Sequence, residues 1–328
     1  MYSWGVDTSD WRGSGSYKYD SARSPYLDKL ATDSSKKGPR TYNTGSSPDM
    51  KLVNTRGKTI KSDSENPIVV AIDVTGSMAS WPKEIFDRLP LFYQTLSQYK
   101  PDLEISFAAI GDAYCDSYPI QVNDFGKGVK LEDHLKALYP EGGGGGQSSE
   151  SYELFAYYML NHCETPKAKN PFLFIYGDEN FYSEINNKQV EHYIGDKLQT
   201  TLKSSDVWQK LLQKFNVYHL HKPYGGISDG QDKSIKASWA KAIGSQKIID
   251  LPSYDRAVDI AMGVVAKHWG EFGDFKSNLS ARQNDPTVRK SVYDSLRFIH
   301  DDLSDKSVVT GKINSVTTAS LTGGADDK

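Results

Sequence analysis

Short apolar runs alternate along this chain with longer segments in which apolar residues recur at helical spacing. The clearest run, residues 68–72, is followed by a segment, residues 81–99, whose apolar side chains repeat every three or four positions. The run predicts a strand buried on both faces, and the repeat predicts an amphipathic helix. The alternation continues, with further strands expected at residues 103–110, 119–122, 172–176, 216–220 and 247–250 and further helices at residues 131–138, 151–159, 188–194, 206–215 and 254–268.

Strands that alternate with helices predict a particular fold class. Each helix serves as a crossover, so the strands that it joins are parallel and the helix covers one face of the sheet. Over residues 66–270 we therefore expect an α/β fold, with a Rossmann-like, central and mostly parallel sheet and helices on both faces.

The regions that flank this domain differ from it in composition. Residues 1–65 are rich in Ser, Gly, Asp, Lys and Tyr, which predicts an extended, partly disordered N-terminal arm. The aromatic residues of the arm fit self-association or docking on a partner, but they also fit packing on the arm's own domain, which loses less association entropy. Residues 271–303 predict a C-terminal helical appendage, and residues 304–328 predict a disordered tail.

Charge and composition argue against several classes of partner. With 39 Lys and Arg against 42 Asp and Glu, the net charge is −3, which does not favour nucleic acid or an anionic membrane. No apolar run approaches the roughly 20 residues that span a bilayer, and the N-terminus lacks the apolar core of a signal peptide. Cys115 and Cys163 follow no zinc or redox spacing, so we expect reduced thiols and a cytoplasmic location.

Polar side chains gather where the predicted strands end. Asp73, Thr75 and Ser77 directly follow the first apolar run, and Asp178 follows a second fully apolar strand. In a parallel α/β sheet, ligands bind outside the carboxyl ends of the strands. Hard cations such as Mg²⁺ prefer oxygen ligands, so a metal site is one interpretation of these residues. The other is a turn in which Asp73 and Ser77 cap backbone donors.

A run of glycines, residues 142–146, precedes another predicted helix. Such a run can bind phosphate at the start of the helix. A Walker loop, however, would end in Gly-Lys-Ser or Gly-Lys-Thr, and here the run ends in Gln147 followed by two serines. Nucleotide hydrolysis is therefore not expected, and the run instead brings side-chain oxygens towards the same edge of the sheet.

These three segments, in this order, resemble the von Willebrand factor A (VWA) family. The metal-ion-dependent adhesion site (MIDAS) of that family uses an Asp-x-Ser-x-Ser loop, a second-loop Thr and a third-loop Asp. The resemblance covers about residues 66–270. It implies that Thr75 and Ser77 coordinate Mg²⁺ directly, whereas Asp73 and Asp178 act mostly through bound waters, which Mg²⁺ tends to keep. Mn²⁺ and Ca²⁺ are alternative ions.

Asp178 lies in the order Gly-Asp-Glu where the family has an Asp-Gly turn, and two further positions depart from the family pattern. Thr75 stands in place of the more usual serine, and Gln147 stands where the second-loop threonine belongs and offers a neutral carbonyl oxygen. Ser148 and Ser149 either complete the metal site or cap the helix that follows. The expected metal-site residues are Asp73, Thr75, Ser77, Gln147 and Asp178.

The resemblance also implies a function. In the VWA family, an acidic residue of a partner protein fills the open coordination position of the metal, which then holds the two proteins together. We therefore expect a non-enzymatic, Mg²⁺-dependent protein-protein interaction module in an intracellular multiprotein assembly. Intracellular members commonly act as adaptors, including in complexes with AAA+ ATPases, and a partner of that kind is an implication of the resemblance.

Two other functions are compatible with these residues. A Mg²⁺-dependent phosphatase would use Asp73 as its nucleophile and Asp178 as a metal ligand. That chemistry usually has a second carboxylate where this chain has Thr75, and no lysine at a strand end presents itself as the phosphate clamp. A structural assembly subunit would carry a vestigial metal site and make its contacts through the N-terminal arm.

Overall fold

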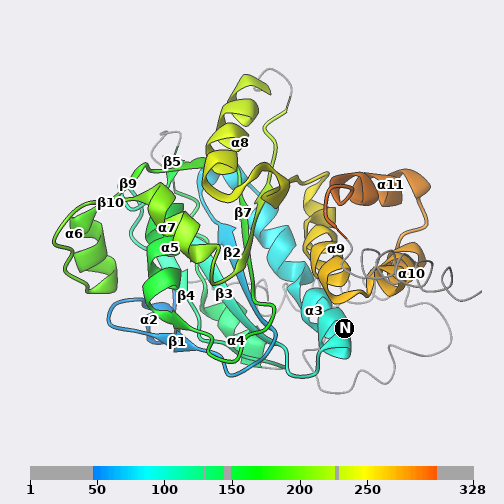
Figure 1. Ribbon diagram of the computed structural model, residues 1–328, viewed down its shortest axis with the longest axis horizontal. Helices are drawn as coiled ribbons and strands as arrows, with labels where there is room; N and C mark the ends of the chain where they lie inside the picture. Colours follow the sequence, from blue (N-terminus) through cyan, green and yellow to red (C-terminus); the bar gives the residue numbers. More distant parts are fainter. Residues whose placement is uncertain (1–46, 129, 144–148, 226–228, 301–328) are drawn as a thin grey trace, which may run out of the picture.

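A six-stranded sheet lies at the centre of the molecule, with strand order β12-β11-β7-β2-β3-β4 (Figure 1). The computed structural model describes residues 47–128, 130–143, 149–225 and 229–300. β4 is antiparallel to β3, and all other neighbours in the sheet are parallel, which confirms the predicted fold class. The strands are β2 (Pro67–Asp73), β3 (Glu104–Ile110), β4 (Ile120–Val122), β7 (Phe172–Gly177), β11 (Asn216–His221) and β12 (Ile248–Asp250).

β2 is a central strand of this sheet, and every residue in it is buried. It pairs with β3 on one side, where Asp73 lies opposite Ile110, and with β7 on the other, where Ile72 lies opposite Tyr176. The chain runs from β2 to β3 and β4 on one side and later returns to β7 on the other. The carboxyl end of β2 is therefore a topological switch point, which is where α/β sheets bind ligands.

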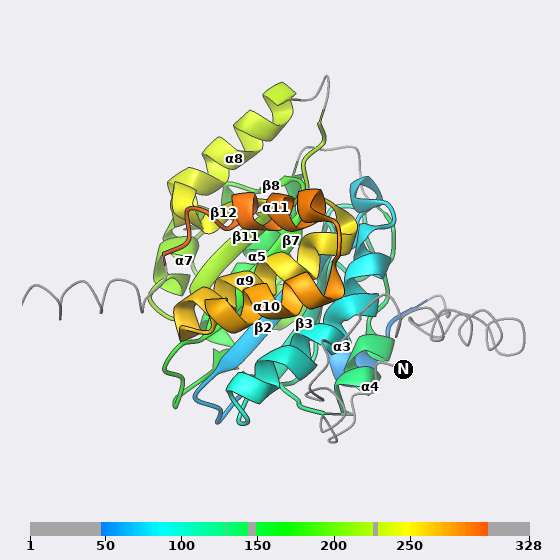
Figure 2. The same ribbon diagram turned by 90° about the vertical axis from the view of Figure 1, so that its right-hand side faces the viewer.

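Helices cover both faces of the sheet (Figures 1 and 2). One face packs against α3 and α9, with α10 and α11 packed on α9, and the other face packs against α5, α7 and α8. The helices are α2 (Met50–Val53), α3 (Trp81–Tyr99), α4 (Lys130–Ala137), α5 (Tyr152–Asn161), α6 (Asn187–Gln189), α7 (Ser204–Leu211), α8 (Asp229–Ile243), α9 (Ala257–Trp269), α10 (Phe272–Arg282) and α11 (Pro286–Ser295).

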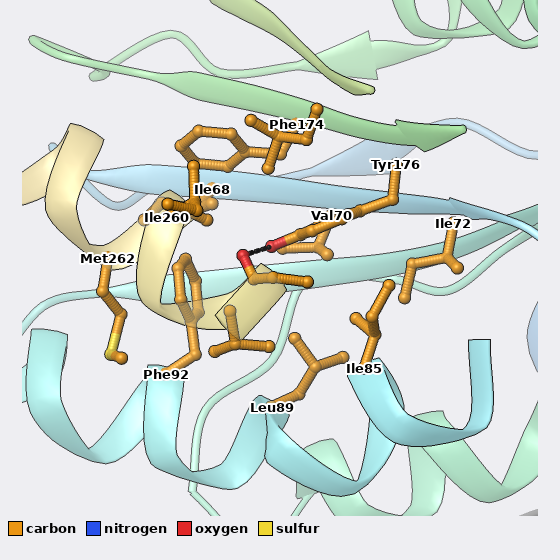
Figure 3. Close-up of a cluster of buried hydrophobic side chains, with 14 of the residues drawn as sticks. Ile68, Val70, Ile72, Ile85, Leu89, Phe92, Phe174, Tyr176, Ile260 and Met262 are labelled. Carbon is orange, nitrogen blue, oxygen red and sulfur yellow. Dashed lines mark hydrogen bonds between the residues drawn. The ribbon is translucent and has the colours of Figure 1, made fainter. Parts of the chain in front are cut away.

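Alternate residues of β2 contribute to two separate hydrophobic cores. Ile68, Val70 and Ile72 pack with the apolar side chains of α3 and α9 (Figure 3), whereas Val69 and Ala71 face α5 and α7. This division follows from the period of two in a strand. Full burial of each branched aliphatic side chain contributes roughly 1.5–3 kcal/mol, so β2 is held firmly from both sides.

The chain before β2 lies against the domain from residue 47 onwards. Val53 and Ile60 are completely buried there. The short strands pair as β1 (Ile60–Lys61) with β6 (Cys163–Glu164), β5 (Ser149–Glu150) with β8 (Asn180–Phe181), and β9 (Glu184–Ile185) with β10 (Leu202–Lys203). The rest of the predicted arm, residues 1–46, and the predicted tail, residues 304–328, lie outside the described residues.

The helices of the expected C-terminal appendage contribute to the main core. Leu279, Val292 and Leu296 are completely buried and belong to the same hydrophobic cluster as α9. Gly263 in α9 allows this close packing, because a Cβ atom there would lie 2.2 Å from Cδ1 of Leu296. α10 and α11 therefore extend the core on this face of the sheet (Figure 2).

Two helical segments differ from the prediction. α8 has no counterpart among the predicted helices. It is largely polar, and its buried stripe consists of a few residues such as Ile235, Trp239 and Ala242, which give only a weak periodic signal. The helix predicted at residues 188–194 is α6 followed by a π-helical turn at Val190–Ile194.

Cys115 and Cys163 are free thiols, as predicted, the first exposed and the second buried. Within the part of the chain that the structure describes, none of the helices has the length and apolar character to cross a bilayer.

Candidate metal centre

The turn after β2 is built on the side chain of Asp73. Its Oδ1 accepts hydrogen bonds from the backbone N of Thr75, at 2.8 Å, and from Oγ1 of Thr75, at 2.6 Å. The chain then enters a 3-10 turn, Gly76–Met78, and continues into α3. Asp73 thus caps backbone and hydroxyl donors of its own turn, so the turn interpretation and the metal interpretation use the same geometry.

The two hydroxyl groups of this turn connect Asp73 to Asp178. Oγ1 of Thr75 lies 3.2 Å from Oγ of Ser77, and Oγ of Ser77 donates to Oδ1 of Asp178 at 2.9 Å. Asp73 and Asp178 are completely buried and Thr75 is 2% exposed, whereas Ser77 is only half-buried. The result is a row of carboxylate, hydroxyl, hydroxyl and carboxylate, in which each hydroxyl donates to its own carboxylate and the row meets solvent at Ser77.

The structure therefore brings together four of the predicted site residues, Asp73, Thr75, Ser77 and Asp178. They converge because β2 and β7 are neighbouring parallel strands whose carboxyl ends lie at one edge. The fifth, Gln147, lies outside the described residues, as does Ser148.

The start of the glycine run packs directly on this turn. The backbone N of Gly142 donates to the carbonyl of Val74 at 3.0 Å, and the backbone N of Gly76 donates to the carbonyl of Gly143 at 2.5 Å. A Cβ atom on Gly143 would lie 1.9 Å from Oδ1 of Asp116. A side chain at this position would displace Asp116, so the close approach of the backbone favours glycine here.

Tyr152 is a member of the site that the sequence did not reveal. Its hydroxyl donates to Oδ2 of Asp73, and its ring packs edge-on against Trp239 at 5.5 Å between ring centroids. Tyr152 begins α5, in a segment of mostly apolar residues. A tyrosine in such a segment is typical of a core position, so no pattern in the sequence distinguishes it from its neighbours.

Lys222 is the second missed residue, and here the sequence held a usable signal. Nζ of Lys222 donates to Oδ2 of Asp178 at 2.7 Å. Lys222 directly follows the last residue of β11, just as Asp178 directly follows β7. The expectation that no lysine stands at a strand end of this edge is wrong, because β11 extends through His221 rather than ending at Leu220.

Burial and mutual repulsion raise the pKa values of carboxyl groups around the turn. Burial first, and then the charge of Asp178, raise the pKa of Asp73 to about 7, against the hydrogen bonds from Thr75 and Tyr152 that favour its charged form. The pKa of Glu150, which is 4% exposed, is raised to about 10 by burial and by the charge of Asp73. Its Oε2 has no hydrogen-bond partner among the described residues. Buried acidic groups are thus crowded at the site, and their charged forms are disfavoured unless positive charge is added.

The donor set fits a hard divalent cation. All of the side-chain atoms that could bind a metal here are oxygens. When the hydroxyl groups of Thr75 and Ser77 donate their protons to the carboxylates, the lone pairs of the hydroxyl oxygens are left for another group. Two ligands at right angles around Mg²⁺ would be about 2.9 Å apart, close to the 3.2 Å between these hydroxyl oxygens. Among the described residues, no cluster of three or more His, Cys, Asp and Glu side chains is arranged for a metal, and the set here is two carboxylates with two hydroxyls.

Comparisons with known proteins find similarity to solved structures. No protein-family model matches the sequence, and no curated protein matches it. Proximal thread matrix protein 1 (PTMP1) from the mussel byssus is similar at 9% identity and a TM-score of 0.44, over 63% of this chain and 48% of PTMP1. The pilus adhesin SpaC from Lactobacillus rhamnosus GG, in an open conformation, is similar at 13% identity and a TM-score of 0.45, over 68% of this chain and 31% of SpaC.

Another structure of PTMP1, described as having a zinc occupied MIDAS motif, is similar at 12% identity and a TM-score of 0.40, over 63% of this chain and 48% of PTMP1. This chain therefore spans about half or less of the length of these proteins. At such identities the similarity concerns the fold alone.

Proposed function

We propose that this chain is a non-enzymatic interaction module that binds a divalent cation, Mg²⁺ in the first place, at the end of β2 and uses it to hold a carboxylate of a partner protein. The observation that carries the proposal is the row of Asp73, Thr75, Ser77 and Asp178, buried at its two carboxylates and open to solvent at Ser77. It stands at the switch point of a parallel sheet, where such folds bind ligands.

The residues present divide into two roles. The hydroxyl oxygens of Thr75 and Ser77 would hold the cation, and Asp73 and Asp178 would orient those hydroxyls by accepting their protons. A bound divalent cation would supply a Lewis acid to which an oxygen from another molecule can attach. Burial of Asp73 and then the charge of Asp178 raise the pKa of Asp73, so the site favours added positive charge.

The partner is proposed from the same chemistry. A carboxylate is the oxygen ligand that proteins most readily offer to Mg²⁺, so an exposed Asp or Glu of the partner would attach at the solvent-facing side of Ser77. We place the module in a cytoplasmic multiprotein assembly, with an AAA+ ATPase or another assembly component as the partner, on the resemblance to the VWA family alone.

For the phosphatase alternative, the structure provides one required residue and makes another unsuitable. Lys222 provides the strand-end lysine that this alternative lacked. The required nucleophile, however, is Asp73, which is completely buried and accepts hydrogen bonds at both carboxylate oxygens. A nucleophile must reach its substrate, and this side chain is committed to its own turn and to Tyr152.

Calorimetric titration of Mg²⁺ and Mn²⁺ tests the cation site. Thr75→Ala removes one proposed ligand, and we expect it to abolish detectable binding. Thr55→Ala is the matched control, because Thr55 is also 2% exposed and instead donates to the carbonyl of Tyr193. Equal binding by wild type, Thr75→Ala and Thr55→Ala would contradict the site assignment.

Affinity capture with and without EDTA tests the interaction. We expect the wild type and Thr55→Ala to retain a partner in Mg²⁺ and to release it in EDTA, whereas Thr75→Ala should fail to retain it in either buffer. Partners retained unchanged in EDTA would contradict a metal-dependent contact and favour the structural subunit with a vestigial site.

A further inference from the structure

Lys222 lies in direct contact with the proposed cation site. It follows β11, and its backbone N donates to the carbonyl of Gly177 at 2.9 Å, which fixes the start of the side chain beside β7. Nζ lies 2.7 Å from Oδ2 of Asp178 and 4.8 Å from the ring centroid of Tyr224. The ammonium group is thereby held between a carboxylate and an aromatic face, both of which favour a cation.

The ion pair between Lys222 and Asp178 is buried. The two side chains are 11% and 0% exposed. Lys236 and Asp250 form a pair of the usual surface kind, with side chains 34% and 53% exposed. Exposed pairs contribute little, whereas a buried carboxylate that loses its counter-charge is left at a large desolvation cost. Lys222 therefore matters for the charge state of the site in a way that surface lysines do not.

Every carboxylate oxygen of the turn has a donor within the protein. Asp73 accepts from Thr75 at Oδ1 and from Tyr152 at Oδ2. Asp178 accepts from Ser77 at Oδ1 and from Lys222 at Oδ2. Of these donors, Lys222 alone carries a positive charge. The ammonium group thus supplies the counter-charge that a divalent cation would supply at the same carboxylates.

We propose that Lys222 is a tethered counter-ion that competes with the divalent cation for Asp178 and so sets the cation affinity of the site. This inference rests on the proposed function. Two cationic groups beside one buried carboxylate repel each other strongly at low local dielectric, so occupation of the site by a divalent ion and the contact between Lys222 and Asp178 oppose each other. Lys222 neutralises Asp178 when no divalent ion is bound. The site therefore binds a divalent ion less tightly than the same oxygen atoms would if Lys222 were absent.

Replacement of Lys222 tests this competition by calorimetric titration of Mg²⁺ and Mn²⁺. Lys222→Met keeps most of the length of the side chain without its charge, and Lys222→Gln also keeps a donor for Asp178, which protects the fold. We expect the dissociation constant to fall by about 5- to 150-fold in both variants, the range of typical coupling between two ligands. Lys222→Arg, which keeps the charge, should stay within about threefold of wild type on the same scale.

Lys236→Met is the matched control, because it removes one positive charge from an exposed ion pair and should leave the dissociation constant unchanged. Thermal unfolding gives a second readout. In EDTA, Lys222→Met should unfold at a lower temperature than wild type, and added Mg²⁺ should raise its unfolding temperature by more than it raises that of wild type.

The possible failures are distinct. Equal dissociation constants for wild type, Lys222→Met and Lys222→Gln would overturn the role of Lys222 and leave the proposed cation site intact. Absence of binding in wild type and in both variants, with unfolding temperatures that do not respond to Mg²⁺, would overturn the proposed function and this inference together.

Discussion

The hydroxyl of Tyr152 occupies the space next to Gly177 in which any other residue would place its side chain. A Cβ atom at Gly177 would lie 2.1 Å from the Tyr152 oxygen, and that oxygen donates to Asp73. Gly177 immediately precedes Asp178. This one glycine therefore permits the hydrogen bond from Tyr152 that orders Asp73, and it also positions Asp178. The glycine therefore links β7 to the proposed site.

Gly177→Ala should disturb both the fold and the site. Displacement of Tyr152 by the added methyl group should lower the free energy of unfolding by about 1–3 kcal/mol, the usual cost of overpacking, and should weaken binding of Mg²⁺. Denaturant unfolding and calorimetry measure the two effects. Gly273→Ala in α10 is the control, because nothing lies within 4 Å of a Cβ atom there; it should stabilise the protein by up to about 1 kcal/mol. Equal stability of the two variants would contradict the packing argument.

Tyr152→Phe isolates the hydroxyl from the ring. Loss of the donor to the buried Asp73 should lower the free energy of unfolding by about 1–3 kcal/mol. It should also weaken Mg²⁺ binding, because the hydrogen bond from Tyr152 favours the charged form of Asp73. Tyr158→Phe is the matched control: both tyrosines are 0% exposed, and the hydroxyl of Tyr158 has no hydrogen-bond partner among the described residues. A larger loss of stability in Tyr158→Phe than in Tyr152→Phe would be the opposite of the expected order.

The sequence predicts much of this architecture because the sheet is buried on both faces. A strand such as β2 must then be apolar throughout, and its end is marked by the first polar residue, Asp73. The same reasoning marks Asp178 at the end of β7. Since the carboxyl ends of parallel strands share one edge, the convergence of Asp73, Thr75, Ser77 and Asp178 follows from the strand pattern alone.

The rest of the site depends on tertiary contacts that leave a weak local signal. Tyr152 contacts Asp73 across 79 positions of the chain, from a helix that is otherwise apolar. α8 carries its buried residues on too narrow a stripe for periodicity to detect. Lys222 differs from these residues, because it follows β11 as directly as Asp178 follows β7. It is not identified from the sequence only because the predicted strand ends at residue 220, one residue before the end of β11.

Leu296→Ala tests whether the C-terminal helices belong to the core. Leu296 is completely buried against Gly263 of α9. Its truncation should lower the free energy of unfolding by about 2–5 kcal/mol, as for other buried leucines. Phe298→Ala, two residues further on, removes a larger side chain that is 67% exposed and should change stability by no more than about 0.5 kcal/mol. Comparable small effects from both would indicate that these helices are a dispensable appendage.

Glu153 predicts how stability depends on pH. This residue of α5 is 1% exposed, and its Oε2 accepts from the backbone N of Tyr182 at 3.1 Å. Burial raises the pKa of Glu153 to about 8 from an ordinary value of 4.5. The folded state therefore holds a proton that the unfolded chain releases above pH 4.5. The contribution of Glu153 to stability is largest below that pH and is lost as the pH rises towards 8.

Glu153→Gln should remove this part of the pH dependence, because the amide is neutral at every pH and can still accept from Tyr182. Denaturant unfolding at pH 5 should give similar stabilities for the variant and wild type. At pH 8 the variant should be the more stable, by up to roughly 4 kcal/mol if the full pKa shift is expressed. Glu132→Gln changes a half-buried residue that is paired with Lys136 at the surface, and it should leave the slope unaltered. Stability curves for Glu153→Gln and wild type that run parallel from pH 5 to pH 8 would show that Glu153 is ionised in the folded protein.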